Sequence, residues 1–185
     1  MKSNLKKILA TIIICFLLLI CYSQLKTNTN TFKTDTRSLV DSSSIYFTPK
    51  GWVNDYENLF TEQEILTLDS VIADFEKKTT IEIAIVTIDT NACAKNSFDD
   101  FTLELARIWG VGKNESNNGI LIGLSKGFRK IRINNATGIE NLISDTETKE
   151  IIQNEMIPAY KNDNYYQGTI LGIEKLILVL NTKMK

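Results

Sequence analysis

The chain has 185 residues, of which 43% are hydrophobic and 23% are charged, and its formal net charge is −1. This composition is typical of one globular domain and excludes a disordered, collagen-like or coiled-coil chain. The sequence contains no histidine, which excludes a Ser-His-Asp triad, a Cys-His pair and histidine-ligated zinc.

Residues 1–24 have the pattern of an export signal. Three lysines precede the apolar run Ile8–Ile20, which is shorter than the roughly 20 residues of a membrane-spanning helix. Small residues then predict cleavage after Ser23, although an uncut anchor and lipidation of Cys21 remain alternatives. We therefore expect an exported protein that is periplasmic or secreted, or tethered to a membrane through its N-terminus.

Residues 25–48 are rich in Thr, Ser, Asn and Asp and predict a flexible linker before a domain at 49–183. Removing residues 1–23 leaves 18 basic and 22 acidic residues, so a nucleic-acid partner is not expected. Cys93 is then the only cysteine left, which excludes an internal disulfide. We expect a monomer.

The first half of the domain alternates strands and helices. A short strand is predicted near 52–54, and the capping box from Thr61 to Glu64 begins a helix with an apolar stripe. Residues 81–88 are mostly apolar and β-branched, which predicts a buried central strand in a parallel sheet. A second helix is predicted to begin at Ser97 and to end at Gly110.

The second half begins with a hairpin. Residues 119–124 and 130–134 predict its two strands. A helix then begins at a second capping box and is expected to end near Ile157, closed by Pro158, before a last helix capped by Asp163. Together these elements predict an α/β fold, a three-layer α-β-α sandwich with a central mixed sheet and one antiparallel hairpin.

Polar side chains are predicted to converge at one edge of this sheet. The hairpin brings Asn117 and Asn118, before its first strand, close to residues that follow its second strand. Glu140 lies in that following segment, and Asp145 is in the first turn of the next helix. A cluster of oxygen donors without His or Cys suits a hard cation, calcium or magnesium.

Each of these residues also has a purely structural explanation. Asn117 and Asn118 precede a glycine in a common turn composition, Asp145 suits a helix start, and Glu140 could be solvated. Asp55 follows the first strand and could make an Asx turn. Only their convergence favours a metal site.

These segments together resemble the TPM domain family, which includes thylakoid-lumen phosphatase-like proteins and many exported bacterial proteins. The resemblance covers about 49–181 and rests on several short motifs in one order. They are Gly51-Trp52-Val53-Asn54-Asp55-Tyr56, Ile83-Ala84-Ile85-Val86-Thr87, Trp109-Gly110-Val111-Gly112, Asn117-Asn118-Gly119-Ile120-Leu121-Ile122, Arg129-Lys130-Ile131-Arg132-Ile133 and Gly138-Ile139-Glu140.

The resemblance implies an exported α/β sandwich, and it makes Asp55, Glu140 and Asp145 candidate ligands of a divalent metal. Where the family usually has Asp, this chain has Asn117, and the lost carboxylate predicts weaker cation binding. Ala136 replaces a usual glycine.

Three functions follow as hypotheses. The first is a module that binds Ca²⁺ or Mg²⁺ at Asp55, Asn117, Asn118, Glu140 and Asp145 and engages a membrane or envelope protein complex. The second is a metal-assisted acid phosphatase acting on phosphomonoesters, with Asp55 or Asp145 as the base. The third is a ligand-free structural envelope domain.

Overall fold

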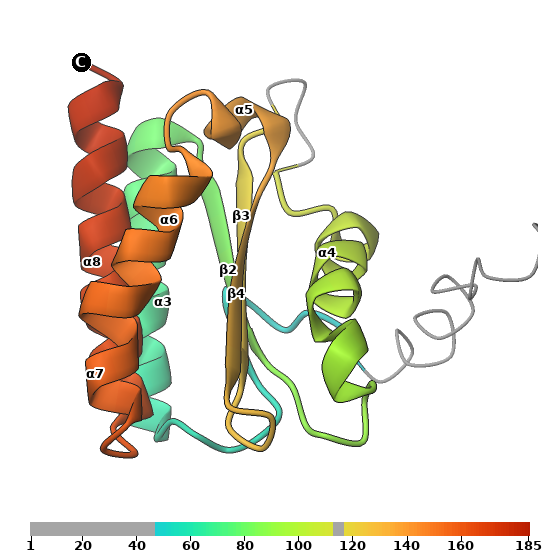
Figure 1. Cartoon of the computed structure of the whole chain (residues 1–185). Coiled ribbons are helices and arrows are strands. Elements are labelled where there is room, and N and C mark those ends of the chain that lie inside the picture. The colour runs from blue at the N-terminus through green and yellow to red at the C-terminus, as the bar shows by residue number, and fades with distance from the viewer. Residues whose placement is uncertain (1–46, 113–116) are drawn as a thin grey trace, which may run out of the picture. The chain divides into compact units, whose positions relative to one another are not determined.

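A computed structural model describes residues 47–112 and 117–185 as a four-stranded sheet with helices on both faces (Figure 1). The predicted signal and most of the predicted linker lie outside these residues. Within the described part of the chain, no helix combines the length and the apolar character needed to cross a membrane.

The sheet has the order β1-β2-β3-β4, in sequence order. Its strands are β1 (Val53–Asp55), β2 (Glu82–Thr87), β3 (Gly119–Ser125) and β4 (Lys130–Asn135). β1 and β3 both pair parallel with β2, whereas β3 and β4 form an antiparallel hairpin. The mixed sheet, its hairpin and the central parallel position of β2 confirm the prediction.

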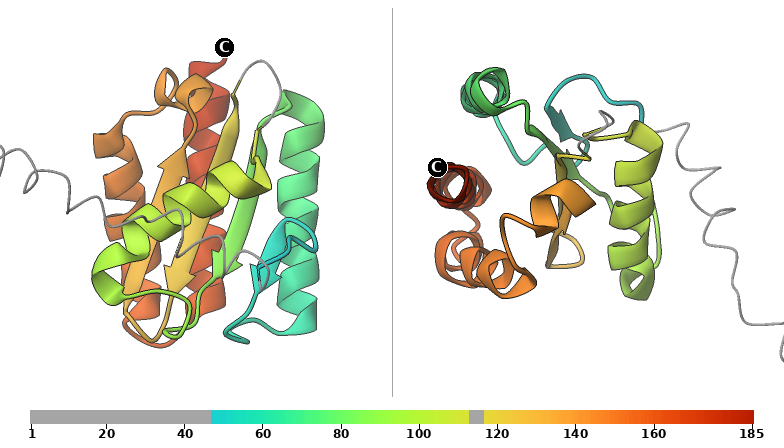
Figure 2. Two further views of the ribbon diagram at one scale, coloured as in Figure 1. Left: turned by 90° about the vertical axis from the view of Figure 1, so that its right-hand side faces the viewer. Right: turned by 90° about the horizontal axis from the view of Figure 1, so that it is seen from above.

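The helices divide between the two faces of the sheet. α4 (Phe98–Trp109) covers one face, and α3 (Glu62–Thr79), α6 (Asp145–Ile151), α7 (Ile157–Tyr160) and α8 (Tyr165–Lys183) cover the other (Figures 1 and 2). The three-layer sandwich is therefore confirmed. The short helix α5 (Thr137–Glu140), which the sequence did not predict, follows β4 directly.

Two separate apolar clusters hold the layers together. Ile83, Ile85, Ile120 and Ile122 alternate along β2 and β3 toward the larger helical layer, where α3 and α8 bury their stripes. Ala84, Val86 and Leu121 point to the opposite face and pack against α4. This explains why β2 and β3 are apolar on both sides, because each face of the sheet packs against different helices.

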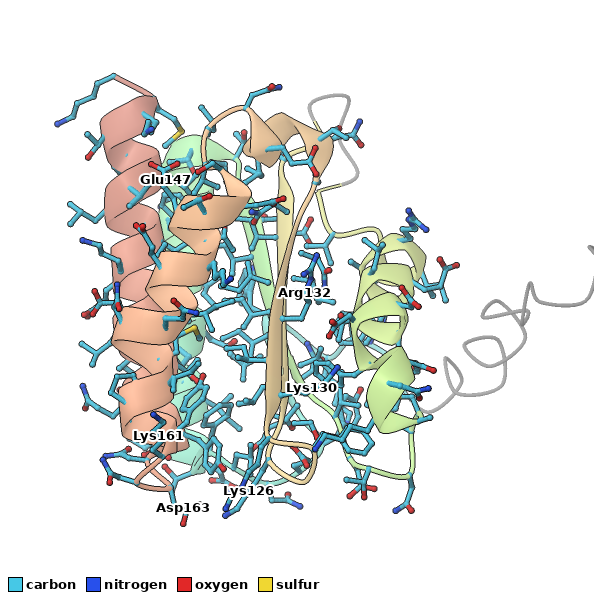
Figure 3. All side chains as sticks on the ribbon, viewed as in Figure 1. Lys126, Lys130, Arg132, Glu147, Lys161 and Asp163 are labelled. Carbon is cyan, nitrogen blue, oxygen red and sulfur yellow. The ribbon has the colours of Figure 1, made fainter. Side chains whose placement is uncertain are left out.

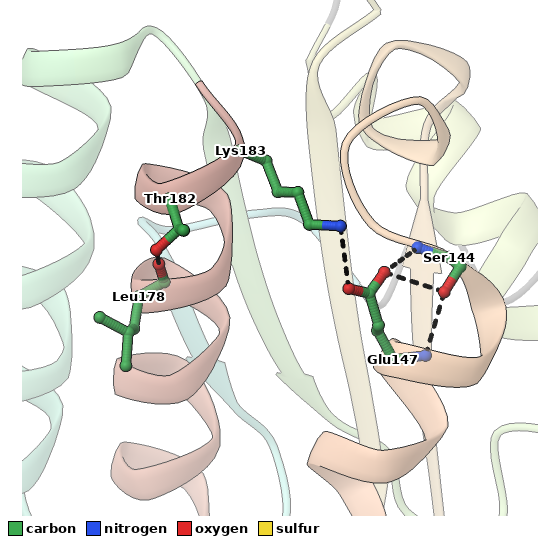
Figure 4. A network of polar contacts seen from close by, with 5 residues as sticks. All are labelled: Ser144, Glu147, Leu178, Thr182 and Lys183. Carbon is green, nitrogen blue, oxygen red and sulfur yellow. Dashed lines mark hydrogen bonds and ion pairs between the residues drawn. The ribbon is translucent and has the colours of Figure 1, made fainter. Parts of the chain in front are cut away.

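The two predicted capping boxes are present. The Thr61 hydroxyl accepts from the Glu64 amide, and the Glu64 carboxylate accepts from the Thr61 amide at 2.7 Å. The box of Ser144 and Glu147 begins α6 in the same way, and Lys183 of α8 adds an ion pair to Glu147 at 3.1 Å (Figure 4). The latter contact ties the ends of two helices together.

Three helix boundaries differ from the prediction. Ser97 caps nothing, because a single 3₁₀ turn, η1 (Lys95–Ser97), leads into α4. Pro158 does not close its helix: the chain continues without a break from α6 through the π-helical segment η2 (Ile152–Met156) into α7, and the wider π turn shifts the backbone hydrogen bonds just before Pro158. Asn164, not Asp163, caps α8, by accepting from the Gln167 amide.

Candidate functional site

The two ends of the sheet carry different polar groups. At the Gly119 end, defined by Glu82, Gly119 and Asn135, β2 and β3 begin and β4 ends. At the Thr87 end, defined by Asp55, Thr87 and Ser125, the three parallel strands end. Five residues of β2 separate the two ends, which is about 16 Å at the usual rise of a strand.

A cleft of about 520 Å³ opens at the Gly119 end, between the last turn of α4 and the segment that follows β4. We call it the Glu140 cleft. Its lining residues are Leu103, Ala106, Arg107, Gly110, Val111, Gly112, Asn117, Gly119, Leu121, Asn134, Asn135, Ala136, Thr137 and Glu140. Three of its six polar side chains are therefore amides, and the other three are a carboxylate, a guanidinium and a hydroxyl.

Two glycines allow the backbone to form this cleft. Gly112 has a φ of +73°, and a Cβ on it would overlap the backbone of Asn118 and Gly119. A Cβ on Gly119 would overlap the carbonyl of Val111 in turn. The Glu82 carboxylate fixes the crossing by accepting from the Gly112 amide at 2.7 Å. The spacing of these glycines in the sequence thus reflects a close contact between two backbone segments.

Buried amides near the cleft keep hydrogen-bonding capacity unused. Asn118, 7% exposed, donates through Nδ2 to the Thr80 carbonyl at 2.6 Å, which leaves its Oδ1 without a partner among the described residues. Asn135 donates to the Thr148 hydroxyl at 3.0 Å, and its Oδ1 is likewise unpaired within the described part. A buried amide oxygen without a donor costs about 1–3 kcal/mol unless a ligand or water satisfies it.

Asn134 offers the complementary group. It is 6% exposed, and its Oδ1 accepts from the Arg132 Nε at 3.4 Å. Its Nδ2 is buried without an acceptor among the described residues. Asn134 lies on the α4 side of β4, as Arg132 does, so this unpaired donor belongs to the side of the Glu140 cleft, whereas the Asn135 side chain faces Thr148 of α6.

The predicted site residues are only partly brought together. Asn117 and Glu140 line the Glu140 cleft, and Asn118 is buried at the same end of the sheet. Asp145 lies in the exposed first turn of α6 and does not line the cleft. Among the described residues, no three acidic or cysteine side chains are grouped so that they could hold a metal ion.

Asp55 corrects the prediction of a single site, because it lies at the Thr87 end. Its register partner is Thr87, five residues along β2 from Glu82. Ligands of one calcium ion lie only about 2.3–2.6 Å from it, so Asp55 cannot share an ion with Glu140. The sequence could not show this, since a strand of three residues can pair with either half of its neighbour.

The Asp55 carboxylate serves the fold instead. One oxygen accepts from the Thr87 hydroxyl at 2.6 Å, and the other accepts from the Phe60 amide at 2.8 Å. The Thr87 hydroxyl in turn accepts from the Glu57 amide at 2.8 Å. These bonds fix the segment that leads from β1 to α3, which agrees with the structural alternative for Asp55.

Glu57 completes the network at the Thr87 end. Its carboxylate accepts from the Lys126 and Gly127 amides in the turn of the hairpin, at 2.9 and 3.3 Å. Burial raises the pKa of Glu57, and these two backbone hydrogen bonds oppose that rise. The carboxylate therefore anchors the β3–β4 turn to the segment after β1.

The motif around Trp52 is structural for a similar reason. The Trp52 indole donates to Glu76 of α3 at 2.6 Å, and the Val53 amide donates to the Asp69 carboxylate at 3.0 Å. Asn54 is buried and donates to the Gly51 carbonyl at 2.9 Å. The motif thus fixes β1 against α3.

Sequence reasoning missed Arg107, Glu82 and Asn134 at the Gly119 end, and it placed Asn135 there only as the start of the segment after the hairpin. One signal for the asparagines was available. Asn134 and Asn135 continue the alternating pattern of β4 past its last isoleucine, and two amides at the end of a strand are unusual for a buried position. Nothing in the sequence pointed to Arg107 or Glu82.

Comparisons with known proteins agree with this fold. A model of the TPM domain matches residues 53–179. The solved N-terminal domain of a protein from P. gingivalis is 30% identical, with a TM-score of 0.64, and the alignment covers 71% of this chain and 82% of that one. The search of curated proteins found no match.

Two more distant structures share the fold alone. The BA42 protein of the psychrophilic bacterium Bizionia argentinensis is 24% identical over 69% of this chain and 86% of its own, with a TM-score of 0.56. The N-terminal domain of the cg2496 protein from Corynebacterium glutamicum is 14% identical over 74% of this chain and 80% of its own, with a TM-score of 0.50. Since the family model spans most of the domain in the order of its elements, the chain belongs to the TPM domain family.

Proposed function

We propose that this TPM domain is a binding module that takes a divalent cation, calcium first, in the Glu140 cleft. The observation that carries the proposal is that the Glu140 carboxylate lines the same cleft as the side-chain amides of Asn117 and Asn134. Carboxylate and amide oxygens are the ligands that calcium prefers, and calcium tolerates irregular geometry. Magnesium requires a stricter octahedron and is the second choice.

The composition of the lining predicts weak binding. Glu140 is the one carboxylate among the lining residues, and Arg107 places a positive charge on the same cleft. Asn117 contributes an uncharged amide. Because the number of charged ligands sets calcium affinity, we expect a dissociation constant of about 10⁻⁴–10⁻³ M.

A calcium titration of the full chain, followed by calorimetry and by amide NMR shifts, tests the proposal. Glu140→Gln removes the charge and keeps the shape, and should weaken binding by about tenfold or more. Asp145→Asn is the matched control, since Asp145 is exposed nearby but does not line the cleft. No shift at residues 134–140 in millimolar calcium, or equal losses in the two variants, would refute the site.

We further propose that the protein is exported and engages a membrane or envelope protein complex. This part rests on the signal-like residues 1–24 and on the family resemblance. Mass spectrometry of the protein from fractionated cells tests it. A mature chain beginning at Gln24 outside the cytoplasm is expected, and an uncleaved cytoplasmic chain would contradict it.

The phosphatase alternative gains no specific support. Asp55, one candidate base, has each of its carboxylate oxygens hydrogen-bonded at the Thr87 end. Asp145, the other, does not line the Glu140 cleft.

A further inference from the structure

The outer side of β4 is an open strand edge. β4 is the last strand of the sheet and pairs only with β3. The Ala136 amide donates to the Gly119 carbonyl at 2.9 Å. This bond determines which residues of β4 form hydrogen bonds with β3 and which point away from it. By that alternation, residues 130, 132 and 134 bond to β3, and the N–H and C=O groups of Ile131 and Ile133 point outward.

Positive charge surrounds this edge. Lys130 and Arg132 lie on β4 itself, on the side of α4, and Lys126 and Lys161 lie near its hairpin end (Figure 3). Asp99 pairs with Lys130 at 3.4 Å, and Asp163 pairs with Lys126 at 3.6 Å.

Three further cations form no ion pair with a described residue: Arg129, Arg132 and Lys161. The surroundings of the edge thus carry a surplus of positive charge, although the chain as a whole is slightly acidic.

A second cleft, of about 320 Å³, lies at the hairpin end of β4. We call it the Tyr160 cleft. Leu124, Ile131 and Ile157 supply apolar walls, and Tyr160 and Tyr165 supply aromatic ones. Ile131 therefore contributes both an outward backbone edge and a wall of this cleft.

We propose that β4 is a docking edge for an extended peptide segment in which acidic and apolar side chains alternate. Such a segment would add a fifth strand by backbone hydrogen bonds to Ile131 and Ile133. Side chains of a strand alternate between faces, so its acidic residues would meet Lys130 and Arg132. Its apolar residues would lie on the side of Ile131, and one would enter the Tyr160 cleft.

Charge argues against a second copy of the chain as the occupant. Antiparallel pairing of two β4 edges would bring Lys130 and Arg132 of one copy close to the same residues of the other. Like charges opposite each other on paired strands are destabilising. A strand with acidic side chains would instead place negative charges opposite Lys130 and Arg132, which is favourable.

The test uses the full chain and a defined probe, the peptide acetyl-Glu-Val-Glu-Ile-Glu-Val-amide, with a control peptide in which lysine replaces each glutamate. Ile131→Pro removes an outward N–H and leaves the hydrogen bonds to β3 in place. Ile131→Val keeps that N–H and is its matched control. Arg132→Glu tests the charge.

We expect the amide signals of residues 130–134 to shift with the acidic peptide and not with the lysine peptide. Loss of a backbone bond or of the cation should weaken binding by about tenfold in Ile131→Pro and in Arg132→Glu, while Ile131→Val stays within about twofold. Hydrogen exchange of the Ile131 and Ile133 amides should slow when the peptide binds, which tests the edge without any variant.

Several results would overturn the proposal. They are no shift at millimolar acidic peptide, equal binding of both peptides, unchanged exchange of the two amides, and Arg132→Glu binding as the wild type does. Dimers formed through β4 in sedimentation, or binding to phosphatidylserine vesicles in place of the peptide, would assign the edge to another occupant.

Discussion

Replacing Gly119 by alanine tests the backbone crossing that shapes the Glu140 cleft. Gly119 has an ordinary strand conformation, so alanine can adopt its backbone angles and only space is at issue. The new Cβ would lie 2.7 Å from the Gly112 nitrogen and would overlap the Val111 carbonyl. These are backbone atoms, and the Glu82 carboxylate holds that segment at the Gly112 amide. The segment must therefore move as a whole.

The expected cost is that of an overpacked core, about 1–3 kcal/mol. For a domain of this size that corresponds to a fall in melting temperature of about 2–12 °C. Urea unfolding gives the free energy directly, and calcium titration of the same variant shows whether a displaced 110–112 segment also weakens binding.

Two other glycines calibrate the result. A Cβ on Gly51 meets no atom within 4 Å, so Gly51→Ala should change the free energy of unfolding by less than about 0.5 kcal/mol. A Cβ on Gly123, in the same strand as Gly119, meets the side chain of Thr102 rather than backbone, and should cost an intermediate amount. The reasoning fails if Gly119→Ala is as stable as Gly51→Ala.

Two further predictions concern polar networks. Thr87→Val removes the hydroxyl that bonds both Asp55 and the Glu57 amide, and should lower the free energy of unfolding in urea by about 2–3 kcal/mol. Calcium binding at the Glu140 cleft should be unchanged. Equal stability of Thr87→Val and Thr87→Ser would contradict this prediction. Hydrogen bonds from Ser144 and the nearby Lys183 lower the pKa of Glu147 from 4.5 to about 2. Because the folded pKa lies below the unfolded one, Glu147 stabilises the fold above about pH 4.5, and this stabilisation is lost as the pH falls toward 2. The urea midpoint of Glu147→Gln should therefore fall less than that of the wild type over this range, and parallel pH curves would refute the assignment.

Most of the fold was predictable because its signals are local. A capping box involves residues three apart, and an apolar stripe or a β-branched run lies within one element. The α3 and α6 starts and the strands β2 to β4 were therefore placed to within one or two residues. Their order then predicted the layers.

The errors occurred where distant contacts decide. Asp163 is a good capping residue, but its φ of +57° is not the extended backbone that an N-cap adopts, and Asn164 makes the capping hydrogen bond one residue later. Proline breaks a regular α-helix because it lacks an N–H for the i→i−4 hydrogen bond. Before Pro158, however, the π-helical segment η2 already replaces the regular backbone hydrogen bonds of the α-helix. Asp55 was assigned to a site whose members lie at the other end of its neighbouring strand.

The difference in hydrogen bonding between the two ends of the sheet favours the Gly119 end as the place where ligands bind. At the Thr87 end, the Asp55 and Glu57 carboxylates each accept from backbone amides, and Thr87 joins the two segments. A ligand there would have to displace bonds that stabilise the fold. At the Gly119 end, the Asn134 amide lines the Glu140 cleft and keeps its Nδ2 without an acceptor among the described residues. A ligand that accepts from this group displaces no hydrogen bond of the protein, so its binding energy is not offset by a loss of stability.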